Sequence, residues 1–452
     1  MADRRPSDIR LRGGTPGAVD ARRTRLGDHD VILARCDPSV RKGALTPEDG
    51  ETLADAARHA LASRLPLIVS MASSGADVGA GLAATFGWGR AARAITECSG
   101  VVPILMVAAG PAVSGPALLL GLADHVVMTT DAYAFVSGPR MVMEITGVAV
   151  DPDELGGTAV HAALTGLAAL VAADADEALD AITDLLDYLP AHVDERPPIR
   201  PTSDPADRAT PELRDLVPAA SHGSYDVRDA IRSIADDGEM IELRASWAGN
   251  LVTAFASVDG RPAGFLANQP QTIAGTLDIA ASQKGARFVA FCDAFNLPLV
   301  TLIDTSGFYP GKDLEWRGII RHGAQMAFAY ARATVPRIAI VLRKAYGGAY
   351  IVMDSRPMGS DLYLAWPSAE VAVMGAKGAV EILHRRATPD ERAEAELAYE
   401  DAFLNPWRAS ERGSVDAVID PADTRREIAN ALETLDSKQE RLAGRRHDNT
   451  PL

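Results

Sequence analysis

The sequence contains few cysteines. Its 452 residues include three, Cys36, Cys98 and Cys292, which lie far apart and form no Cys-x-x-Cys pair. A zinc ribbon needs paired cysteines, and a disulfide scaffold needs more than a sparse, odd set. The sequence therefore predicts no metal site, and it indicates a chain that works in a reducing, cytoplasmic compartment.

A surplus of positive charge is also missing. The formal net charge is −16 at pH 7. Such a surface repels phosphate backbones, so nucleic acid is not an expected partner. Residues 1–25 are rich in Arg, Asp, Pro and Gly and contain no apolar run of the kind found in a secretory signal. We expect them to form a disordered N-terminal arm.

Long uninterrupted apolar runs do not occur either. No charged residue lies between Glu97 and Asp124, but Pro103, Pro111 and Pro116 interrupt this stretch. Proline breaks a helix, so a membrane-spanning helix is not expected here. A buried strand, a glycine-rich turn and a buried helix fit the composition better.

Several enzyme motifs are absent, namely GxSxG, the GxxxxGK phosphate loop and HExxH. Ser306, Asp304 and His322 are near one another in the sequence, but no motif marks them as a catalytic triad. Residues 79–84 match GxGxxA, yet an SSGAD turn separates them from the preceding apolar run. Serine hydrolysis and dinucleotide binding are therefore disfavoured.

What the sequence does contain is an internal duplication. LPLIVSMASSG (65–75) matches LPLVTLIDTSG (297–307) at a spacing of 232, and two further segments, which end at Gly115 and Gly348, match at 233. A third pair surrounds Gly138 and Gly375. Each half alternates short apolar runs with small-residue turns and helices, which is typical of parallel α/β folds. We expect two homologous α/β domains, residues 26–195 and 221–452, joined by a Pro- and Asp-rich linker at 196–220.

The most distinctive turn is KAYGGAY (344–350), which follows the apolar run IAIVL. Small residues between a strand and a helix expose backbone N–H groups, which can stabilise an oxyanion or an enolate. A tight turn made only for packing is the alternative. The matching turn at 110–116 offers fewer donors, because Pro116 has no N–H. The Ser-Gly turns at Gly75 and Gly307 either supply further donors or simply turn the chain.

These segments resemble the carboxyltransferase (β) subunits of acyl-CoA carboxylases, such as propionyl-CoA and acetyl-CoA carboxylases. The resemblance rests on ANQPQTIAGTLDIAASQKGARFVAFCDAFNLP, DTSGFYPGKDLEWRGIIRHGA, RKAYGGAY and AWPSAEVAVMGAKGAVEILHRR in the second half. In the first half it rests on SSGAD, SGVVP, GPAVSG, FVSGP and ELGGTAVH. It implies a duplicated crotonase-like (ClpP/crotonase) fold and transfer of CO2 from carboxybiotin to an acyl-CoA.

The resemblance also implies partners and site residues. The partners are a biotin carboxylase and biotin carrier subunit, the acyl-CoA substrate, and further copies of the chain in a hexamer, with no membrane. The site would lie between the first domain of one subunit and the second domain of its neighbour. Carried over by position, the catalytic residues are Gly348, Ala349, Ser114 and Gly115; the substrate-binding residues are Ile351, Gly75, Ala76, Tyr346 and Gly307; and the biotin-binding residues are Gly347, Gly375 and Ala376.

Three positions depart from the family or vary within it. Ser114 stands where the family usually has glycine. Asp77 replaces the basic residue of the family's SGGAR turn, and the segment before Leu65 is shorter. Ile351 occupies a position that varies between Asp and apolar residues, and isoleucine resembles acetyl-CoA-competent or broad members. A biotin-dependent decarboxylase or transcarboxylase subunit, a non-catalytic scaffold of a carboxylase complex, and other crotonase chemistry such as thioester hydration stay open as alternatives.

Overall fold

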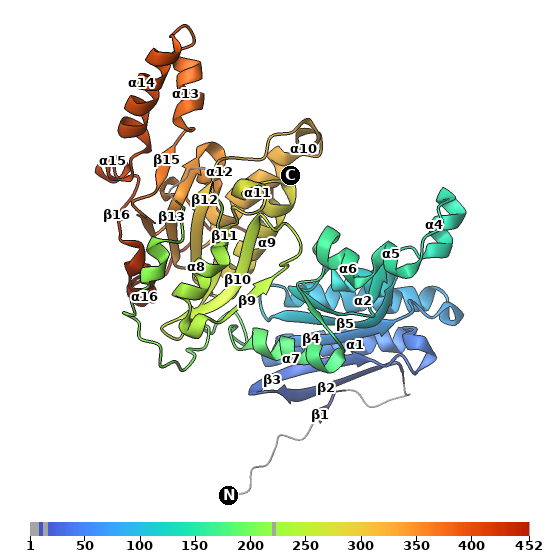
Figure 1. Cartoon of the computed structure of the whole chain (residues 1–452). Helices are drawn as coiled ribbons and strands as arrows, with labels where there is room; N and C mark the ends of the chain where they lie inside the picture. The colour runs from blue at the N-terminus through green and yellow to red at the C-terminus, as the bar shows by residue number, and fades with distance from the viewer. Residues whose placement is uncertain (1–8, 12–16, 219–222, 452) are drawn as a thin grey trace, which may run out of the picture. The chain divides into compact units, whose positions relative to one another are not determined.

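The computed structural model describes residues 9–11, 17–218 and 223–451. The chain divides into two units (Figure 1). Unit 1 extends to Pro197 and includes Arg244–Trp247, and unit 2 comprises Pro198–Leu243 and the chain from Ala248 onward. Their boundary falls inside the segment predicted as a linker. Much of that segment nevertheless packs on unit 2, where Thr210 and Leu213 are buried.

Unit 1 is built on an eight-stranded sheet within its described residues. Its strands are β1 (Ile9–Arg10), β2 (Val19–Leu26), β3 (His29–Cys36), β4 (Leu67–Ser73), β5 (Ile104–Val113), β6 (His125–Thr129), β7 (Tyr133–Phe135) and β8 (Leu170–Ala172). The order is β1-β2-β3-β4-β5-β6-β8, and β7 pairs with β5. The β1–β2–β3 pairs are antiparallel and the others are parallel.

Unit 2 repeats this plan (Figure 1). Its strands are β9 (Met240–Leu243), β10 (Leu251–Val258), β11 (Arg261–Asn268), β12 (Leu299–Thr305), β13 (Arg337–Tyr346), β14 (Leu362–Ala365), β15 (Glu370–Ala372) and β16 (Ala417–Val418). The order is β9-β10-β11-β12-β13-β14-β16, and β15 pairs with β13. Strand for strand this is the order of unit 1, which confirms the duplication predicted from the repeated segments.

The helices of unit 1 pack closely through small residues. The main ones are α1 (Pro47–Ser63), α2 (Leu82–Cys98), α3 (Gly115–Leu120), α4 (Pro139–Thr146) and α7 (Ala175–Leu186). Thr46 and Asp49 form a reciprocal cap that starts α1, with Pro47 in the first turn. A Cβ on Gly50 would come 2.2 Å from the backbone of Gly87 in α2. The two helices can therefore approach only because both positions are glycine.

The helices of unit 2 surround its sheet and also extend beyond it. They include α8 (Val227–Ile234), α9 (Ile279–Ala294), α11 (Ile319–Arg332), α12 (Gly347–Val352) and α16 (Thr424–Thr434). Helices α13 (Ala376–Leu383) and α14 (Pro389–Tyr399) project away from the sheet as a hairpin (Figure 1). A helix follows the last strand of each unit along the chain, α7 in unit 1 and α16 in unit 2.

One expectation about the chain's first residues was wrong. Residues 19–25, predicted as part of a disordered arm, belong to β2, which pairs with β3 along its whole length. The burial along β2 shows the reason: Val19 and Ala21 are packed in the core, whereas Arg23 and Arg25, further along the strand, are exposed. Residues 1–8 and 12–16 of the predicted arm lie outside the described residues.

The proline-interrupted apolar stretch also folds as expected, into β5 followed by α3. No helix in the described part of the chain is long and apolar enough to cross a membrane.

Candidate functional site

Both sheets contain the same irregularity at the ends of their central strands. Between β4 and β5 the register passes from Met71 opposite Ala108 to Ser73 opposite Ala112. Between β12 and β13 it passes in the same way from Ile303 and Val341 to Thr305 and Ala345. One residue of the first strand thus faces three of the second, which is a bulge that bends the strand end. Each bulge is followed directly by a glycine-containing turn and a short helix.

The unit 2 turn (residues 347–349) is the first turn of α12, which begins directly after β13. Gly347 has φ +59°, a backbone conformation that favours glycine. Gly348 is exposed and Ala349 is buried. The first N–H groups of a helix have no acceptor within the helix, so this turn presents backbone donors beside an exposed glycine. The predicted residues Gly347, Gly348 and Ala349 therefore lie together, in a geometry that suits an oxyanion.

The unit 1 turn (residues 114–116) presents fewer backbone N–H groups than the unit 2 turn. The N–H of Ser114 donates to the carbonyl of Phe135 at 2.9 Å, so it is already engaged. Pro116 has no N–H. Of the predicted pair, Gly115 is the member whose N–H the helix leaves without an internal acceptor. Trp88 lies directly over Gly115, since a Cβ there would come 2.9 Å from the indole ring.

Ser114 has a backbone conformation that L-residues rarely adopt, with φ +62° and ψ −122°. Such a position costs a non-glycine residue about 1–3 kcal/mol, while glycine loses somewhat more chain entropy on folding. We expect Ser114→Gly to stabilise unit 1 by about 1 kcal/mol in urea unfolding. Ser114→Ala keeps the Cβ and should give no such gain. Equal stabilisation by both variants would contradict this account.

The two Ser-Gly turns have their N–H groups engaged within the chain. Gly75 donates to Ser73 Oγ at 3.2 Å, and Gly307 donates to Thr305 Oγ1 at 3.4 Å. Both glycines have positive φ, +115° and +142°. Of the two roles left open by the sequence, these N–H groups serve the turn. In unit 1 this Ser-Gly turn lies against the unit 1 turn at residues 114–116, since a Cβ on Gly75 would be 4.0 Å from Ser114 Cβ.

The structure also gathers the predicted residues Tyr346, Gly375 and Ala376. Gly375 packs against the Tyr346 ring, and Tyr346 and Ala376 belong to one small apolar cluster with Leu404. The Tyr346 hydroxyl donates to the Glu370 carboxylate. Burial, followed by this hydrogen bond, raises the pKa of Tyr346 far above its usual value, so the phenol stays protonated.

An apolar cavity of about 570 Å³ opens beside the unit 2 turn. Gly348 and Ile351 form part of its wall, facing Phe308, Ile319 and Ile320. A mostly apolar cavity of this size with backbone donors at one point is typical of a small-molecule site. The predicted pocket residue Ile351 therefore does line a cavity at the turn.

The possible triad of Ser306, Asp304 and His322 does not form. The Asp304 carboxylate accepts hydrogen bonds from Tyr225 and Arg343. The Nδ1 atom of His322 lies 3.1 Å from Gln325 Oε1. Sequence reasoning thus missed the network around Asp304, which has no motif of its own.

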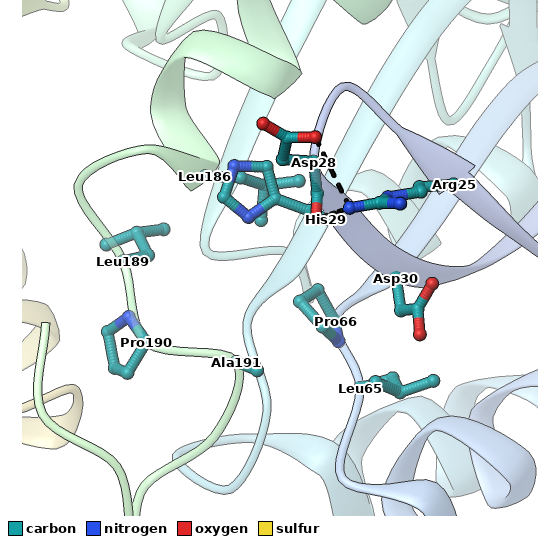
Figure 2. Close-up of a pocket in the computed structure, with 10 residues that line it drawn as sticks. All are labelled: Arg25, Asp28, His29, Asp30, Leu65, Pro66, Leu186, Leu189, Pro190 and Ala191. Atoms are coloured by element: carbon teal, nitrogen blue, oxygen red, sulfur yellow. Dashed lines mark hydrogen bonds and ion pairs between the residues drawn. The ribbon is translucent and has the colours of Figure 1, made fainter. Parts of the chain in front are cut away.

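A second cavity, of about 430 Å³, lies in unit 1 near the start of β3 and β4 (Figure 2). Its polar side chains are engaged in ion pairs: Arg25 with Asp28, also in the lining, at 3.3 Å, and His29 with Asp187, outside the lining, at 2.7 Å. None of the predicted site residues lines it. Among the described residues, no group of three His, Cys, Asp or Glu side chains is placed to hold a metal ion.

Comparisons with known proteins identify the family of the chain. Residues 19–450 match the carboxyl transferase domain. The methylmalonyl-CoA carboxyltransferase 12S subunit of Propionibacterium freudenreichii subsp. shermanii is 44% identical, over 96% of this chain and 84% of that protein. The propionyl-CoA carboxylase beta chain of Roseobacter denitrificans is 41% identical, over 93% of this chain and 83% of its own.

A solved structure extends the likeness to the fold. A crystal structure of the transcarboxylase 12S hexamer, with methylmalonyl-coenzyme A bound, superposes with a TM-score of 0.94 at 43% identity. The match covers 96% of this chain and 85% of that one. This confirms the duplicated crotonase-like fold expected from the resemblance. The chain belongs to the carboxyl transferase domain family, and it is a carboxyltransferase of the kind found in biotin-dependent acyl-CoA carboxylases.

Proposed function

We propose that the chain transfers a carboxyl group from biotin, carried on a partner subunit, to the α-carbon of a short-chain acyl-CoA. The observation that carries this proposal is the pair of turns at matching bulges, one in each unit. Carboxyl transfer of this type develops negative charge on two oxygens, that of the thioester and that of the biotin ureido group. A duplicated anion-stabilising turn suits a reaction with two such oxygens.

Each turn would take one oxygen. In unit 1 the N–H of Gly115, with Ser114 shaping the turn, would stabilise the thioester oxygen when the α-carbon loses its proton, which the biotin ureido nitrogen can accept once CO2 has left it. In unit 2 the N–H groups of Gly348 and Ala349 would hold the ureido oxygen. Biotin supplies the CO2 when bound. The protein's contribution is to place prearranged donors where charge develops, and a missing donor of this kind typically costs about 10²–10³ in rate.

The unit 2 cavity fits a neutral bicyclic ring better than a charged ligand, because its lining is mostly apolar. Gly347, Gly375 and Ala376 would frame the biotin side of this site, next to Tyr346. Ile351 would contact the acyl group. In unit 1, Gly75 and Ala76 border the Ser114 turn and would adjoin the thioester, and Gly307 is the corresponding residue of unit 2.

The acyl-CoA substrate is proposed to be propionyl-CoA or a chain of similar length. The two relatives described above are named for propionyl-CoA and methylmalonyl-CoA. Ile351 instead favours acetyl-CoA or a broad range, as the resemblance implies. An apolar pocket discriminates chains that differ by one methylene only modestly, by about 1–3 kcal/mol, so activity on both is expected.

The proposed assembly is a hexamer that works in the cytoplasm with a biotin carboxylase and a biotin carrier. The solved relative is described as a hexamer. Exposed apolar side chains on the α13–α14 hairpin, among them Ile382, Leu383 and Leu397, would be covered by a second copy. The three cysteines are all free and buried, which suits a reducing compartment.

Transcarboxylation is the second candidate function. It is favoured by the 44% identity to a methylmalonyl-CoA carboxyltransferase subunit. In that case the chain would remove a carboxyl group from methylmalonyl-CoA rather than add one to propionyl-CoA. The two directions use the same turns, so the geometry does not separate them.

A carboxylation assay tests the proposal. The purified chain is mixed with a biotinylated carrier and biotin carboxylase, ATP, labelled bicarbonate, and acetyl-, propionyl- or butyryl-CoA. Acid-stable label on one acyl-CoA would establish carboxyl transfer and identify the substrate. Transfer from methylmalonyl-CoA to the carrier without ATP, and none in the forward assay, would favour transcarboxylation. No label in either assay, despite confirmed assembly with the partner, would contradict the proposal and favour a scaffold.

A further inference from the structure

We infer that Asp304 is a positioning residue for the unit 2 turn, because its carboxylate fixes the bulge of β13 from which the turn departs. The inference rests on the proposed role of this turn as an oxyanion site. It concerns a residue outside the predicted site, buried behind the turn rather than in contact with the substrate.

The carboxylate ties the two central strands together at the bulge. Asp304 lies on β12, opposite the three bulged residues of β13. Its Oδ1 atom accepts the backbone N–H of Lys344 at 3.1 Å. Lys344 is three residues before Gly347, so this bond sets the direction in which β13 enters the turn. A change in that direction would move the N–H groups of Gly348 and Ala349.

The second oxygen is held as firmly as the first. Asp304 Oδ2 accepts from Arg343 Nε at 3.1 Å and from the Tyr225 hydroxyl at 2.9 Å, and Arg343 Nη2 lies 3.0 Å away. Arg343 is anchored in turn, because its Nη1 donates to the Gly223 carbonyl at 2.7 Å. The Asp304 side chain is 3% exposed, so these charge-assisted bonds are shielded from water. The carboxylate therefore cannot rotate away from Lys344.

The backbone of Asp304 is fixed as well. Its N–H donates to Asn268 Oδ1 at 3.2 Å, and Asn268 Nδ2 donates to the Gly275 carbonyl at 3.1 Å. Gly275 packs directly on Asp304, since a Cβ there would come 2.5 Å from the Asp304 carbonyl oxygen. Burial, followed by the Asp304 carboxylate, raises the pKa of Tyr225 well above its usual value, which keeps its hydroxyl a donor.

Unit 1 shows that the fold does not need this network. Its bulge has the same register, but Ala72 stands at the position of Asp304 and Gly110 at that of Arg343. Pro111 stands at the position that corresponds to Lys344, and proline has no N–H to donate. The same bend therefore forms without the carboxylate, the guanidinium or the amide. The bulge thus forms without the network. We infer that the network in unit 2 serves the turn that follows, by fixing the position of its backbone N–H groups.

Asparagine at position 304 tests this role through the direction of its hydrogen bonds. Arg343 offers only donors, so the amide oxygen of Asn must face Arg343 and its NH2 group must face the Lys344 N–H. The NH2 group of the new asparagine and the Lys344 N–H are both donors, so the hydrogen bond from the Lys344 N–H is lost. Replacing Arg343 with methionine as well removes this constraint. The amide can then turn its oxygen to Lys344 and its NH2 group to the Tyr225 oxygen.

The experiment compares Asp304→Asn, the double variant Asp304→Asn/Arg343→Met and the control Asp293→Asn in the full chain with its partner subunits. Asp293 also accepts backbone N–H groups, those of Thr334 at 2.6 Å and Val335 at 3.2 Å, but before the start of β13. We expect Asp304→Asn to lower kcat roughly 10²-fold with little change in KM for acyl-CoA, as a misplacement near 1 Å would do. The double variant should recover most of kcat, and the control should keep it.

Amide hydrogen exchange of the peptide that contains residues 344–349 gives a readout independent of activity. It should become faster in Asp304→Asn, and return towards the wild-type rate in the double variant. A folded Asp304→Asn chain with wild-type kcat and exchange would overturn the inference, as would a double variant as impaired as the single one. If the wild-type chain transfers no carboxyl group, the proposed function fails, while the exchange pattern still decides whether Asp304 positions the turn.

Discussion

Replacing Ala349 with proline is expected to lower kcat by about 10²–10³-fold while the chain stays folded. The substitution removes one backbone N–H from the unit 2 turn and changes little else at this site. If Gly348 and Ala349 together hold the developing negative charge, half of the donor pair is lost. The donor acts on the biotin side, so KM for acyl-CoA should change little.

The chain itself indicates that proline is tolerated at this position. Ala349 corresponds to Pro116, 233 residues earlier, which follows Gly115 in the first turn of α3. Proline is accepted in the first turn of a helix, because its missing N–H has no partner within the helix there. Both Ala349 and Pro116 are buried. The variant thus gives unit 2 the backbone that unit 1 already has.

The measurement is steady-state carboxylation, together with the thermal midpoint of unfolding. Ala349→Ser is the matched control, since it adds an atom to the side chain but keeps the N–H, and we expect a loss of no more than about fivefold, less than one donor is worth. A proline variant with the same kcat as the serine variant would show that this N–H is not a donor in the reaction.

The duplication could be predicted from the sequence because its landmarks are residues with a fixed structural task. Gly75 and Gly307 both have positive φ, and each lies just after the end of a central strand, at the same point of its sheet. The positive φ at this position favours glycine, so glycine is found there in both halves. The apolar residues around it differ between the halves, because several of them can fill the same place in a core. The constant spacing between these glycines therefore predicted from the sequence alone which strands of the two halves correspond.

The misassigned segment shows where composition misleads. Residues 19–26 contain three arginines, and their charge suggested disorder. In the structure these side chains reach solvent and pair with neighbouring acids, as Arg23 does with Asp30 at 2.9 Å. The period-two alternation with Val19 and Ala21 was the signal for a strand.

The details of the site depend on contacts between distant residues. That the N–H of Ser114 is engaged follows from a bond to Phe135 on another strand, which no local pattern reveals. The network of Asp304 likewise joins Tyr225 and Arg343, from three separate parts of the chain. The sequence indicated which turns carry backbone donors. Which of these donors are left for a ligand could be decided only from the folded structure, because it depends on bonds between distant residues.

Arg425 is expected to contribute more to stability than other charged residues of its helix. It lies on α16 with 0% of its side chain exposed, and it donates to Asp236 Oδ1 at 2.7 Å and to the Ile234 carbonyl at 2.6 Å. It also donates to the carbonyls of Pro205 and Asp204, at 3.0 and 3.2 Å. One guanidinium thus holds three segments together: the segment predicted as a linker (196–220), the end of α8, and helix α16.

Arg425→Met should therefore destabilise unit 2 by about 3–5 kcal/mol, because it leaves the Asp236 carboxylate and several carbonyls buried without this cation. Arg426→Met is the control on the same helix. Its side chain is 44% exposed and pairs with Asp423 at the surface, which is worth about 0–1 kcal/mol. Urea unfolding followed by tryptophan fluorescence measures both, since the buried Trp366 donates to Thr424 beside Arg425. Similar losses in the two variants would mean that the helix, rather than the buried guanidinium, holds these segments.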